Sequence, residues 1–537
     1  MTDAMRKRLL LMALILLSCV SLRATERVYI STDRTAYLAG DRVWCSLFCV
    51  DENGRLSEQS AVAYVELASA DGVAVQQKIA LLGGRGSGEF SLPRHMATGT
   101  YRLMAYTALE GARGALTGSR ILSIYQTSSL SRVKDGVSIG RPAQLHFPAD
   151  TSVVLEAQVN RVIRQGSPFT LTLSGAVSDV AVSVYHEDEL FQAPVSSLDG
   201  FLQAFPLASS QPGRKVEYEG EIIHATTRGA SAGSLALLSF SGAPEDAYLS
   251  KVQEDGSIEF VTSNIYGDRE MVCEVVEDNK DIRIRIQDNY LHPDAGSLAP
   301  LALNQDMRSA LIRRKEGLQH QLQADSLALF LPRREDMLLS SVEWERCHLD
   351  DYTRFPTVQE IIVEILPTVR LRQKGGKHFL EVAVTDGINN HRNFKDKILA
   401  MVDGVVISDL RLLLDFDAML LEDIDVCRDP LVSGSVLYNG VVNFITKNNY
   451  VTAIRFPDQV SVVDFQGVRY PLAYLGGVPA QGSDRRELLY WHPSLSVQGS
   501  TRIPLTAPAY EGRFRVVAEG LSADGKPVRA VTSFEVR

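Results

Sequence analysis

Hydrophobic and polar residues alternate in short runs along most of the chain, and turn-forming residues separate the runs. The alternation is clear at residues 27–31, 99–106 and 180–185. Asp-Gly pairs such as Asp71-Gly72 and Asp524-Gly525 stand between runs and are typical of tight hairpin turns. Short strands at this spacing predict a mainly β protein with several immunoglobulin-like β-sandwiches in series.

Two segments follow a helical pattern instead. Residues 303–330 hold four leucines at helical spacing, with charged residues between them: Leu311, Leu318, Leu322 and Leu327. This spacing predicts one helix, which we expect to act as a connector. Residues 355–366 predict a second helix, because Pro356 lies at its start and Pro367 follows its end. Strand-like runs come after it, so we expect a small α+β domain there.

Polar stretches at residues 127–147 and 207–215 predict linkers between folded domains. A chain of 537 residues is also too long for a single hydrophobic core. We therefore expect four sandwiches, the helical connector and the α+β domain. The expected ranges are 26–126, 148–206, 216–290 and 450–537 for the sandwiches, 300–350 for the connector and 351–448 for the α+β domain.

The charge of the chain argues against one class of function. The sequence has 55 Lys and Arg against 65 Asp and Glu, which gives a net charge of −10 and a pI near 5.6. A nucleic-acid binder needs a basic face, and we see no Lys/Arg-rich run beyond the first residues of the chain. We therefore expect no nucleic-acid partner.

The first residues have the pattern of a signal peptide, which we place at 1–24. A basic stretch, Arg6-Lys7-Arg8, precedes an apolar run from Leu9 to Leu17 that is too short to span a bilayer comfortably. Two exits fit: a lipobox at residues 16–19 that would leave Cys19 lipidated, or a signal-peptidase site after Ala24. Either one predicts export to the periplasm or the outer membrane, with membrane association by a lipid anchor or a partner only.

Three pieces of the first sandwich carry a family resemblance. Residues 28–44 read VYISTDRTAYLAGDRVW, residues 88–93 read GEFSLP and residues 99–103 read GTYRL. Together they resemble the macroglobulin-type sandwich of alpha-2-macroglobulins. The thioester motif of that family, a Gly-Cys-Gly-Glu-Gln run, does not occur in the sequence, so the resemblance does not imply covalent trapping.

The α+β segment resembles the plug domain of TonB-dependent outer-membrane receptors. The resemblance rests on the turn and strand at residues 398–404, the strand at 422–427, the strand at 440–447 and the helix at 355–366. A receptor barrel would need about 22 strands. Only the residues from Asn448 to Arg537 follow this segment, so we expect a plug-like module without a pore of its own.

A weaker resemblance concerns residues 216–290, whose Glu-Gly-x-Ile opening and Asp-Gly hairpin are similar to the regulatory domain of carboxypeptidases. That resemblance implies a folding module without peptidase activity. The order of the whole chain resembles large envelope proteins of Bacteroidetes. This order implies an outer-membrane-associated role.

The sequence contains few catalytic or metal-binding motifs. No H-E-x-x-H occurs, and the pair His378 and His391 fits a polar loop better than a metal site. The one G-x-S-x-G motif, Gly229 to Gly233, precedes a strand-like run, so we interpret Ser231 as part of an inter-strand loop. We therefore expect no catalytic residue, cofactor or metal.

Two features remain as candidate partner-binding sites. One is an acidic cluster, which is either a docking surface or cation site or a solvated face: Asp415, Asp417, Glu422, Asp423 and Asp425. The other is Trp491, which follows Tyr490 and is either an aromatic platform for a ligand or a core anchor.

These observations favour a non-enzymatic envelope protein that acts as a protein-interaction scaffold or as the partner of an outer-membrane receptor or transport system. The alternative is an accessory protein that captures a peptide or glycan for uptake, and a hydrolase is the third reading. Ligand capture predicts an aromatic-lined cleft near Trp491 or between domains, whereas a scaffold predicts no such cleft and exposed sheet edges instead.

Overall fold

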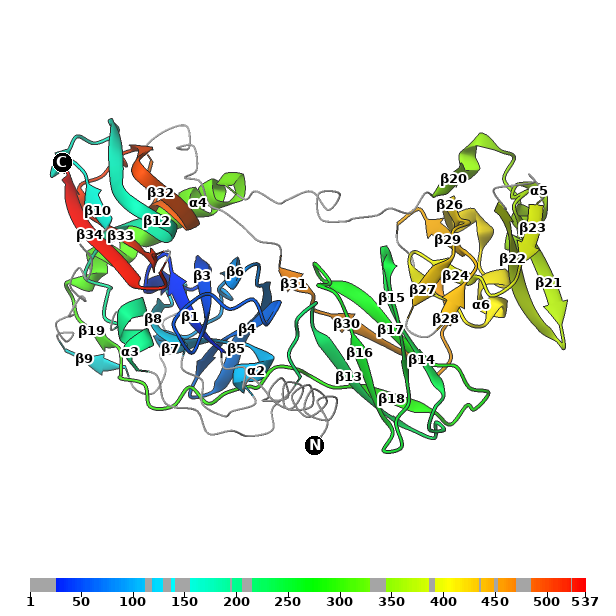
Figure 1. Ribbon diagram of the computed structural model, residues 1–537. Coiled ribbons are helices and arrows are strands. Elements are labelled where there is room, and N and C mark those ends of the chain that lie inside the picture. Colours follow the sequence, from blue (N-terminus) through cyan, green and yellow to red (C-terminus); the bar gives the residue numbers. More distant parts are fainter. Residues whose placement is uncertain are drawn as a thin grey trace, which may run out of the picture. The chain divides into compact units, whose positions relative to one another are not determined.

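The computed structural model describes residues 26–111, 118–128, 137–140, 155–193, 196–204, 215–328, 344–385, 392–433, 436–448, 453–469, 484–522 and 524–537. The chain forms two compact units, whose elements are labelled in Figure 1. Unit 1 combines Met1–Tyr218, His292–Phe330 and Pro471–Arg537, and unit 2 combines Glu219–Leu291 and Leu331–Tyr470. The expected signal peptide and Cys19 lie outside the described residues.

The first part of unit 1 is a sandwich of two sheets, as the alternation predicts. One sheet has the order β1-β3-β6 (Glu26–Thr32, Arg42–Asp51 and Arg85–Ser91). The other contains β2, β8, β7, β4 and β5 in that order (Ala36–Leu38, Ser119–Tyr125, Gly99–Tyr106, Val62–Ser69 and Gly72–Ala80). Leu47, Leu103 and Leu122 are fully buried between the sheets, and the short helix α2 (Ala108–Gly111) follows β7.

The second sandwich of unit 1 corrects the expected domain boundaries. Residues 148–206 and 450–537 were expected to form separate sandwiches, but their strands share one sheet, in the order β10-β12-β33-β34-β11 with β32 also paired to β12. The bounds are Leu155–Gln158, Pro168–Glu187, Gly512–Leu521, Pro527–Val536, Val162–Ile163 and Leu488–Thr506. The physical reason is that the earlier segment supplies only three strands, which cannot cover their own apolar face without partners.

Helix α4 (Met307–Ala328) belongs to unit 1 and is more than a connector. Met307 and Ala310 are fully buried on its inner face. The side of the helix that carries the leucines is only half-buried, at Leu311, Leu318 and Leu322. Three further short elements complete the unit: β9 (Ser138–Ile139), β19 (Ala302–Leu303), which pairs with β9 in parallel, and α3 (Leu198–Gln203).

Unit 2 begins with a sandwich near the expected residues 216–290. Its sheets have the orders β16-β13-β18 and β15-β14-β17-β30. The bounds are Ser257–Val261, Ile222–Arg228, Arg283–Ile286, Ala243–Lys251, Leu235–Phe240, Arg269–Val275 and Ser461–Phe465. Strand β30 therefore returns from far along the chain to complete the second sheet, and β31 (Val468–Arg469) follows it.

The remainder of unit 2 is the expected α+β part. Its main sheet has the order β20-β26-β29-β24-β25 (Glu345–His348, Leu421–Cys427, Val441–Thr446, Leu399–Val402 and Val405–Val406). Two smaller sheets are β21-β22-β23 (Val369–Lys374, Lys377–Thr385 and Arg392–Lys395) and β27-β28 (Leu431–Ser433 and Val436–Tyr438). The strands predicted near residues 398–404, 422–427 and 440–447 thus form within two residues of their expected ends.

Helix α5 (Val358–Glu364) shows why the second helical prediction was accurate. The Thr357 side chain accepts the backbone N–H of Glu360, and the Glu360 carboxylate accepts the backbone N–H of Thr357 in return, which forms a capping box. Val358, Ile361 and Ile362 are buried on the face that meets the sheet. The short elements η2 (Leu349–Asp351), α6 (Leu410–Leu414) and η3 (Ala418–Leu420) complete this part. None of the helices in the described part of the chain is long and apolar enough to cross a membrane.

Candidate functional site

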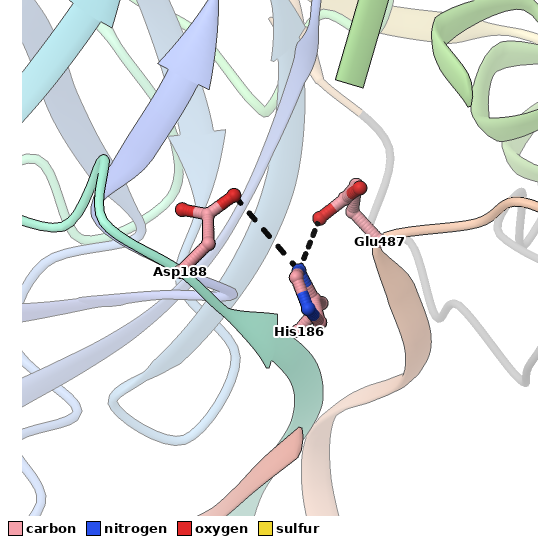
Figure 2. A group of neighbouring side chains, drawn as sticks. All are labelled: His186, Asp188 and Glu487. Carbon is pink, nitrogen blue, oxygen red and sulfur yellow. Dashed lines mark hydrogen bonds and ion pairs between the residues drawn. The ribbon is translucent and has the colours of Figure 1, made fainter. Parts of the chain in front are cut away.

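The ends of two long strands in unit 1 bring acid and base side chains together. His186 lies near the end of β12, and Asp188 follows that strand. Glu487 directly precedes β32, and its backbone carbonyl accepts the N–H of His186 at 2.8 Å. The antiparallel register of β12 and β32 therefore places His186 beside Glu487, although 301 positions separate them. Figure 2 shows the three side chains facing one another.

These three residues are the only group in the described ranges that could hold a metal ion. Their potential ligand atoms lie within 4.8 Å of one another. The His186 Nδ1 atom is 3.0 Å from a Glu487 oxygen and 3.9 Å from an Asp188 oxygen. One imidazole and two carboxylates are a donor set that zinc accepts, so the surroundings decide whether the cluster suits a metal.

Two arginines of α4 surround both carboxylates. Arg314 makes a bidentate contact with Asp188, with both N–O distances at 2.8 Å, and Arg313 reaches the same carboxylate at 2.6 Å. Both guanidinium groups also lie within 3.6 Å of Glu487. The side chains of Arg314 and Asp188 are each only 2% exposed. Two positive charges thus balance two negative ones inside the fold, without any ion.

The electrostatics agree with this balance. Burial by itself would raise the pKa of Glu487, but the hydrogen bond to His186 and the charges of His186, Arg314 and Arg313 outweigh it and lower the pKa well below its ordinary value. Burial tends to lower the pKa of Arg314, and the charges of Asp188 and Glu487 overcome that effect and raise it. Both groups therefore stay ionised at neutral pH.

The His186 ring has little freedom to serve as a ligand. Tyr510 packs edge-on against the ring at 5.2 Å and Phe514 lies 5.1 Å from it. A Cβ added at Gly512 would come within 2.3 Å of Nε2, so the backbone closes on that nitrogen. The other nitrogen already faces Glu487 and Arg313. The geometry fits a buried ion-pair network that joins α4 to two strands better than it fits a metal centre.

A second buried polar cluster explains the macroglobulin-like motif. The Asp33 carboxylate accepts the N–H of Trp44 at 2.9 Å and the hydroxyl of Tyr37 at 2.8 Å, and it pairs with Arg34 at 2.6 Å. Arg34 also reaches Asp41 at 3.2 Å. The motif residues thus clamp the turn between β1 and β3, which is a structural role.

Helix α4 reaches both clusters. The Gln321 carboxamide oxygen accepts the backbone N–H groups of Glu487 and Leu488, each at 3.0 Å, and its amide donates to Asp325 at 2.8 Å. Burial raises the pKa of Asp325 to about 7, against a smaller opposite effect from the Gln321 hydrogen bond and the charge of Arg34. The inner face of α4 therefore carries Arg314, Gln321 and Asp325, all of them polar and buried.

The acidic cluster expected in the sequence does not form one site. Asp423 and Asp425 lie on β26 opposite His348 and Arg346 of β20, which are their register partners. Arg346 holds Asp425 through two contacts of 2.7 Å, and His348 hydrogen-bonds to Asp423, which raises the pKa of His348. These two carboxylates are thus paired across the sheet.

The other three acidic residues lie apart from that pair. Asp415 ends α6, and the Asp417 side chain caps η3 by accepting the N–H of Met419. Glu422 is half-buried on β26 and directly precedes the paired Asp423. The interpretation as one cation site therefore fails, because two carboxylates are neutralised and one serves as a cap.

Trp491 is a core anchor and not a surface platform. It lies on β32, is 2% exposed and packs against Trp44 with ring centroids 5.3 Å apart. Tyr490 beside it is 6% exposed. The expected aromatic-lined cleft is therefore not built on Trp491, because strand parity and the neighbouring sandwich bury both rings.

Nearby, a small cavity of about 20 Å³ has a lining that includes Arg120, Glu519 and Arg529. That volume suits about one water molecule.

The literal G-x-S-x-G motif, at residues 229–233, is a loop between β13 and β14, as its context predicts. Both the backbone N–H and the hydroxyl of Ser231 bind Glu277.

Comparisons with known proteins identify one segment. Residues 27–118 match the MG2 domain family. No curated protein matches the chain at the sequence level. Among solved structures, a Salmonella alpha-2-macroglobulin reacted with methylamine is 9% identical with a TM-score of 0.24. A trypsin-activated alpha-2-macroglobulin from Escherichia coli is 10% identical with a TM-score of 0.23.

Both structural alignments cover 95% of this chain but only 39% and 41% of the macroglobulins. The chain thus spans about two fifths of the length of the structures it matches, and at these TM-scores the likeness supports no argument about the whole chain. The family match agrees with the sandwich of β1 to β8 and with the clamp of Asp33, Arg34 and Asp41. Residues 27–118 are a macroglobulin-like MG2 domain.

Proposed function

We propose that the chain is a non-catalytic multidomain protein of the cell envelope that acts as a protein-interaction scaffold. The observation that carries the proposal is the saturation of the buried cluster by Arg313 and Arg314. A catalytic or metal-binding cluster needs a free lone pair or an open position. Here each carboxylate already faces two guanidinium groups, so the group of described residues that could hold a metal ion serves the fold instead.

The domain content supports the same role. An MG2 domain at residues 27–118 and further sandwiches in both units are architectures that present loops and strand edges to other proteins. We further propose that the chain is exported and is held at the outer membrane by a lipid on Cys19 or by a partner. There it would serve an outer-membrane receptor or transport system. The plug-like order of elements in residues 351–448 supports that choice of partner.

The ligand-capture alternative has no comparable support. It predicted an aromatic-lined cleft near Trp491 or between domains, and the Trp491 side chain is buried against Trp44.

The experiment is crosslinking of the full chain in native envelopes, followed by affinity purification in detergent, beside a Cys19→Ala variant. We expect a β-barrel protein to co-purify in near-stoichiometric amount, and Cys19→Ala to move the complex out of the detergent phase if the lipidated form is the functional one. Recovery of a soluble monomer without any protein partner would overturn the proposal.

A matched activity measurement separates the scaffold from an enzyme. Purified wild type and a His186→Gln variant would be tested against peptide, ester and glycoside substrates. Turnover that His186→Gln abolishes, while the variant keeps its fold, would contradict the non-catalytic role.

A further inference from the structure

The sheet β21-β22-β23 of unit 2 has two unlike faces. Val369, Leu380 and Val382 are at most 3% exposed and lie in the core that α5 covers. The alternate residues point the other way, because successive side chains of a strand alternate between faces. On β21 these are Arg370, Arg372 and Lys374, and all three are exposed.

The opposite strand continues this basic face. In the register of β21 and β22, Lys374 pairs with Lys377 and Arg372 with Phe379. Lys377 is exposed and Phe379 is half-buried. We call the set of Arg370, Arg372, Lys374 and Lys377 the basic ladder.

The basic ladder contrasts with the rest of the chain. Residues 369–397 hold seven Lys and Arg against three Asp and Glu, whereas the whole chain has a net charge of −10. Four of the seven stand within residues 370–377, which read RLRQKGGK. Only the pleat of β21 and the return of β22 bring them onto one face.

The arginines of the ladder are held in place. The Arg370 guanidinium lies over the ring of Phe394 on β23, 3.4 Å from its centroid. Arg372 pairs with Glu381 at 3.2 Å, although its side chain remains 47% exposed. Both charges therefore keep a defined position while facing solvent.

The lysines at the tip are harder to explain by folding alone. Lys374 and Lys377 are direct register partners on either side of the turn formed by Gly375 and Gly376, both of which have positive φ. Like charges directly opposite each other weaken a β-sheet pair, whereas a Lys–Glu pair would strengthen it. Neither lysine forms an ion pair within 4 Å in the described part of the chain, although the charge of Lys377 contributes to the lowered pKa of Asp409. This arrangement favours an external anion.

The free edge of β21 indicates that the anion is an extended peptide. Strand β21 is the outermost strand of its sheet and pairs with β22 alone among the described strands (Figure 1). In an antiparallel pair only alternate residues direct their N–H and C=O groups at the neighbour, so the others on β21 face outward. An extended peptide can add to such an edge as a further strand.

We propose that β21 and the basic ladder bind an extended acidic peptide segment of a partner protein, with Asp or Glu at every second position. The cations of β21 repeat every second residue, at about 7 Å, and side chains on one face of an added strand repeat at the same distance. A second copy of this chain is a poor occupant, because antiparallel pairing of two β21 strands would oppose arginine and lysine with arginine and lysine.

The proposal rests on the scaffold role proposed above and names the chemistry of one partner. The test uses the purified full chain and two fluorescent peptides of about eight residues. One alternates Glu with Val, and the other has the same composition with its Glu residues in one block. Binding is measured by fluorescence anisotropy at low and physiological salt.

We expect the alternating peptide to bind at least about tenfold more tightly than the block peptide, since only its carboxylates match the ladder. The double variant Lys374→Glu/Lys377→Glu should lose about tenfold or more of that affinity. The matched control Lys251→Glu/Lys280→Glu changes the net charge equally at exposed positions of unit 2 and should bind as wild type does. Bound peptide should also slow amide exchange in residues 369–374.

Equal binding of the two peptides, or equal losses in the two double variants, would overturn the proposal in favour of unspecific charge attraction. Preferential binding to heparin or to phosphatidylglycerol vesicles, with the ladder lysines required, would overturn it in favour of a polysaccharide or a membrane. Peptide binding is measured without any envelope partner, so its failure is distinct from failure of the scaffold role. If the full chain co-purifies with a β-barrel protein but binds neither peptide, this inference is wrong and the scaffold role stands.

Discussion

One buried arginine of unit 1 and two exposed arginines of unit 2 have opposite surroundings. In unit 1, Arg314 is buried and bonds to Asp188, and its Nη1 donates to the Ala36 carbonyl at 2.7 Å. In unit 2, Arg370 and Arg372 are exposed, and only Arg372 has a carboxylate partner. A charge removed from water must be compensated at once by the fold, whereas an exposed charge remains available to a partner. Burial therefore distinguishes a structural charge from a binding charge better than residue type does.

The largest expected effect comes from breaking the buried network. Arg314→Met should destabilise unit 1 by about 3–5 kcal/mol, because Asp188 would lose its bidentate partner and remain buried. Calorimetry of the full chain should show the loss in one transition, assigned to unit 1 by hydrogen exchange of β12 and β32. Arg308→Met, at an exposed position of the same helix, is the control and should change little. Equal stability of both variants would contradict the structural role.

The free energy of unfolding at acid pH tests whether the buried network holds Glu487 in its ionised form. Its pKa is lower in the folded state than in the unfolded chain, so its ionisation stabilises the fold above the unfolded pKa, and this contribution is lost as pH falls through the folded pKa. We expect unit 1 to lose about 3 kcal/mol from this group between roughly pH 5 and pH 2. In Glu487→Gln this part of the pH dependence should disappear in denaturant titrations. An unchanged slope would mean that Glu487 is not held by the network.

Asp325 should make the stability of unit 1 fall as pH rises, which is the opposite of the effect of Glu487. Its pKa is raised to about 7 by burial, so folding favours the protonated form and stability falls as pH rises through that value. Asp325→Asn should therefore gain up to about 3 kcal/mol relative to wild type between pH 5 and pH 8, by the same linkage. Glu316→Gln, at an exposed position of α4, is the control. If Asp325→Asn is less stable than wild type at pH 8, Asp325 is ionised and paired with Arg34.

A smaller effect is expected from the backbone that closes on His186. Gly512→Ala would place a Cβ 2.3 Å from Nε2, and the resulting shift of the ring should cost about 1–3 kcal/mol. Gly140→Ala meets open space within 4 Å and should be nearly neutral. Thermal unfolding of both variants checks the difference. A neutral Gly512→Ala would show that the ring can move without disturbing Glu487.

The smallest expected change in stability concerns the exposed lysines of unit 2, which contrast with the buried charges of unit 1. Lys374→Glu/Lys377→Glu should change the stability of unit 2 by no more than about 0.5 kcal/mol, because both side chains are exposed and away from the core. Thermal unfolding at several salt concentrations measures it. A large loss would make the two lysines part of the fold and would weaken the case for an external partner.

The sequence predicted those elements whose signals lie in a short contiguous stretch of residues. The capping residues Thr357 and Glu360 and the flanking prolines identify α5 without tertiary information. The Asp-Gly pair at Asp71 and the one at Asp524 lie in turns that join antiparallel neighbours, as expected. The macroglobulin-like sandwich also emerged from a contiguous stretch, since its two sheets are built from neighbouring residues.

What the sequence could not predict depends on distant partners. The strands of residues 155–187 and 488–536 look like two domains because nothing in either stretch states that β12 pairs with β32. Helix α4 was predicted, but its buried side was not, because hydrophobic periodicity assumes apolar residues inside. The buried positions of α4 include Arg314, Gln321 and Asp325, whose partners come from other segments.

The surroundings of the candidate residues depend on partners from other strands. Asp423 and Asp425 form a dense acidic run in sequence, yet each faces a basic residue on β20. Trp491 is one of three tryptophans, and its neighbour in the core, Trp44, is far away in the chain. The cluster of His186, Asp188 and Glu487 was missed because β12 and β32 meet only through strand register. The basic ladder was missed although its four residues lie within positions 370–377.

The three-segment construction of unit 1 has a consequence for biosynthesis. Strand β12 leaves the ribosome long before β32 and β33, and the whole of residues 219–470 is made in between. The parts of β12 that pair with β32 and β33 must therefore wait without those strands while unit 2 is synthesised and folds. Exposed edges of this kind invite misassembly, so we expect nascent chains to depend on a holding chaperone until residue 488 and its successors arrive.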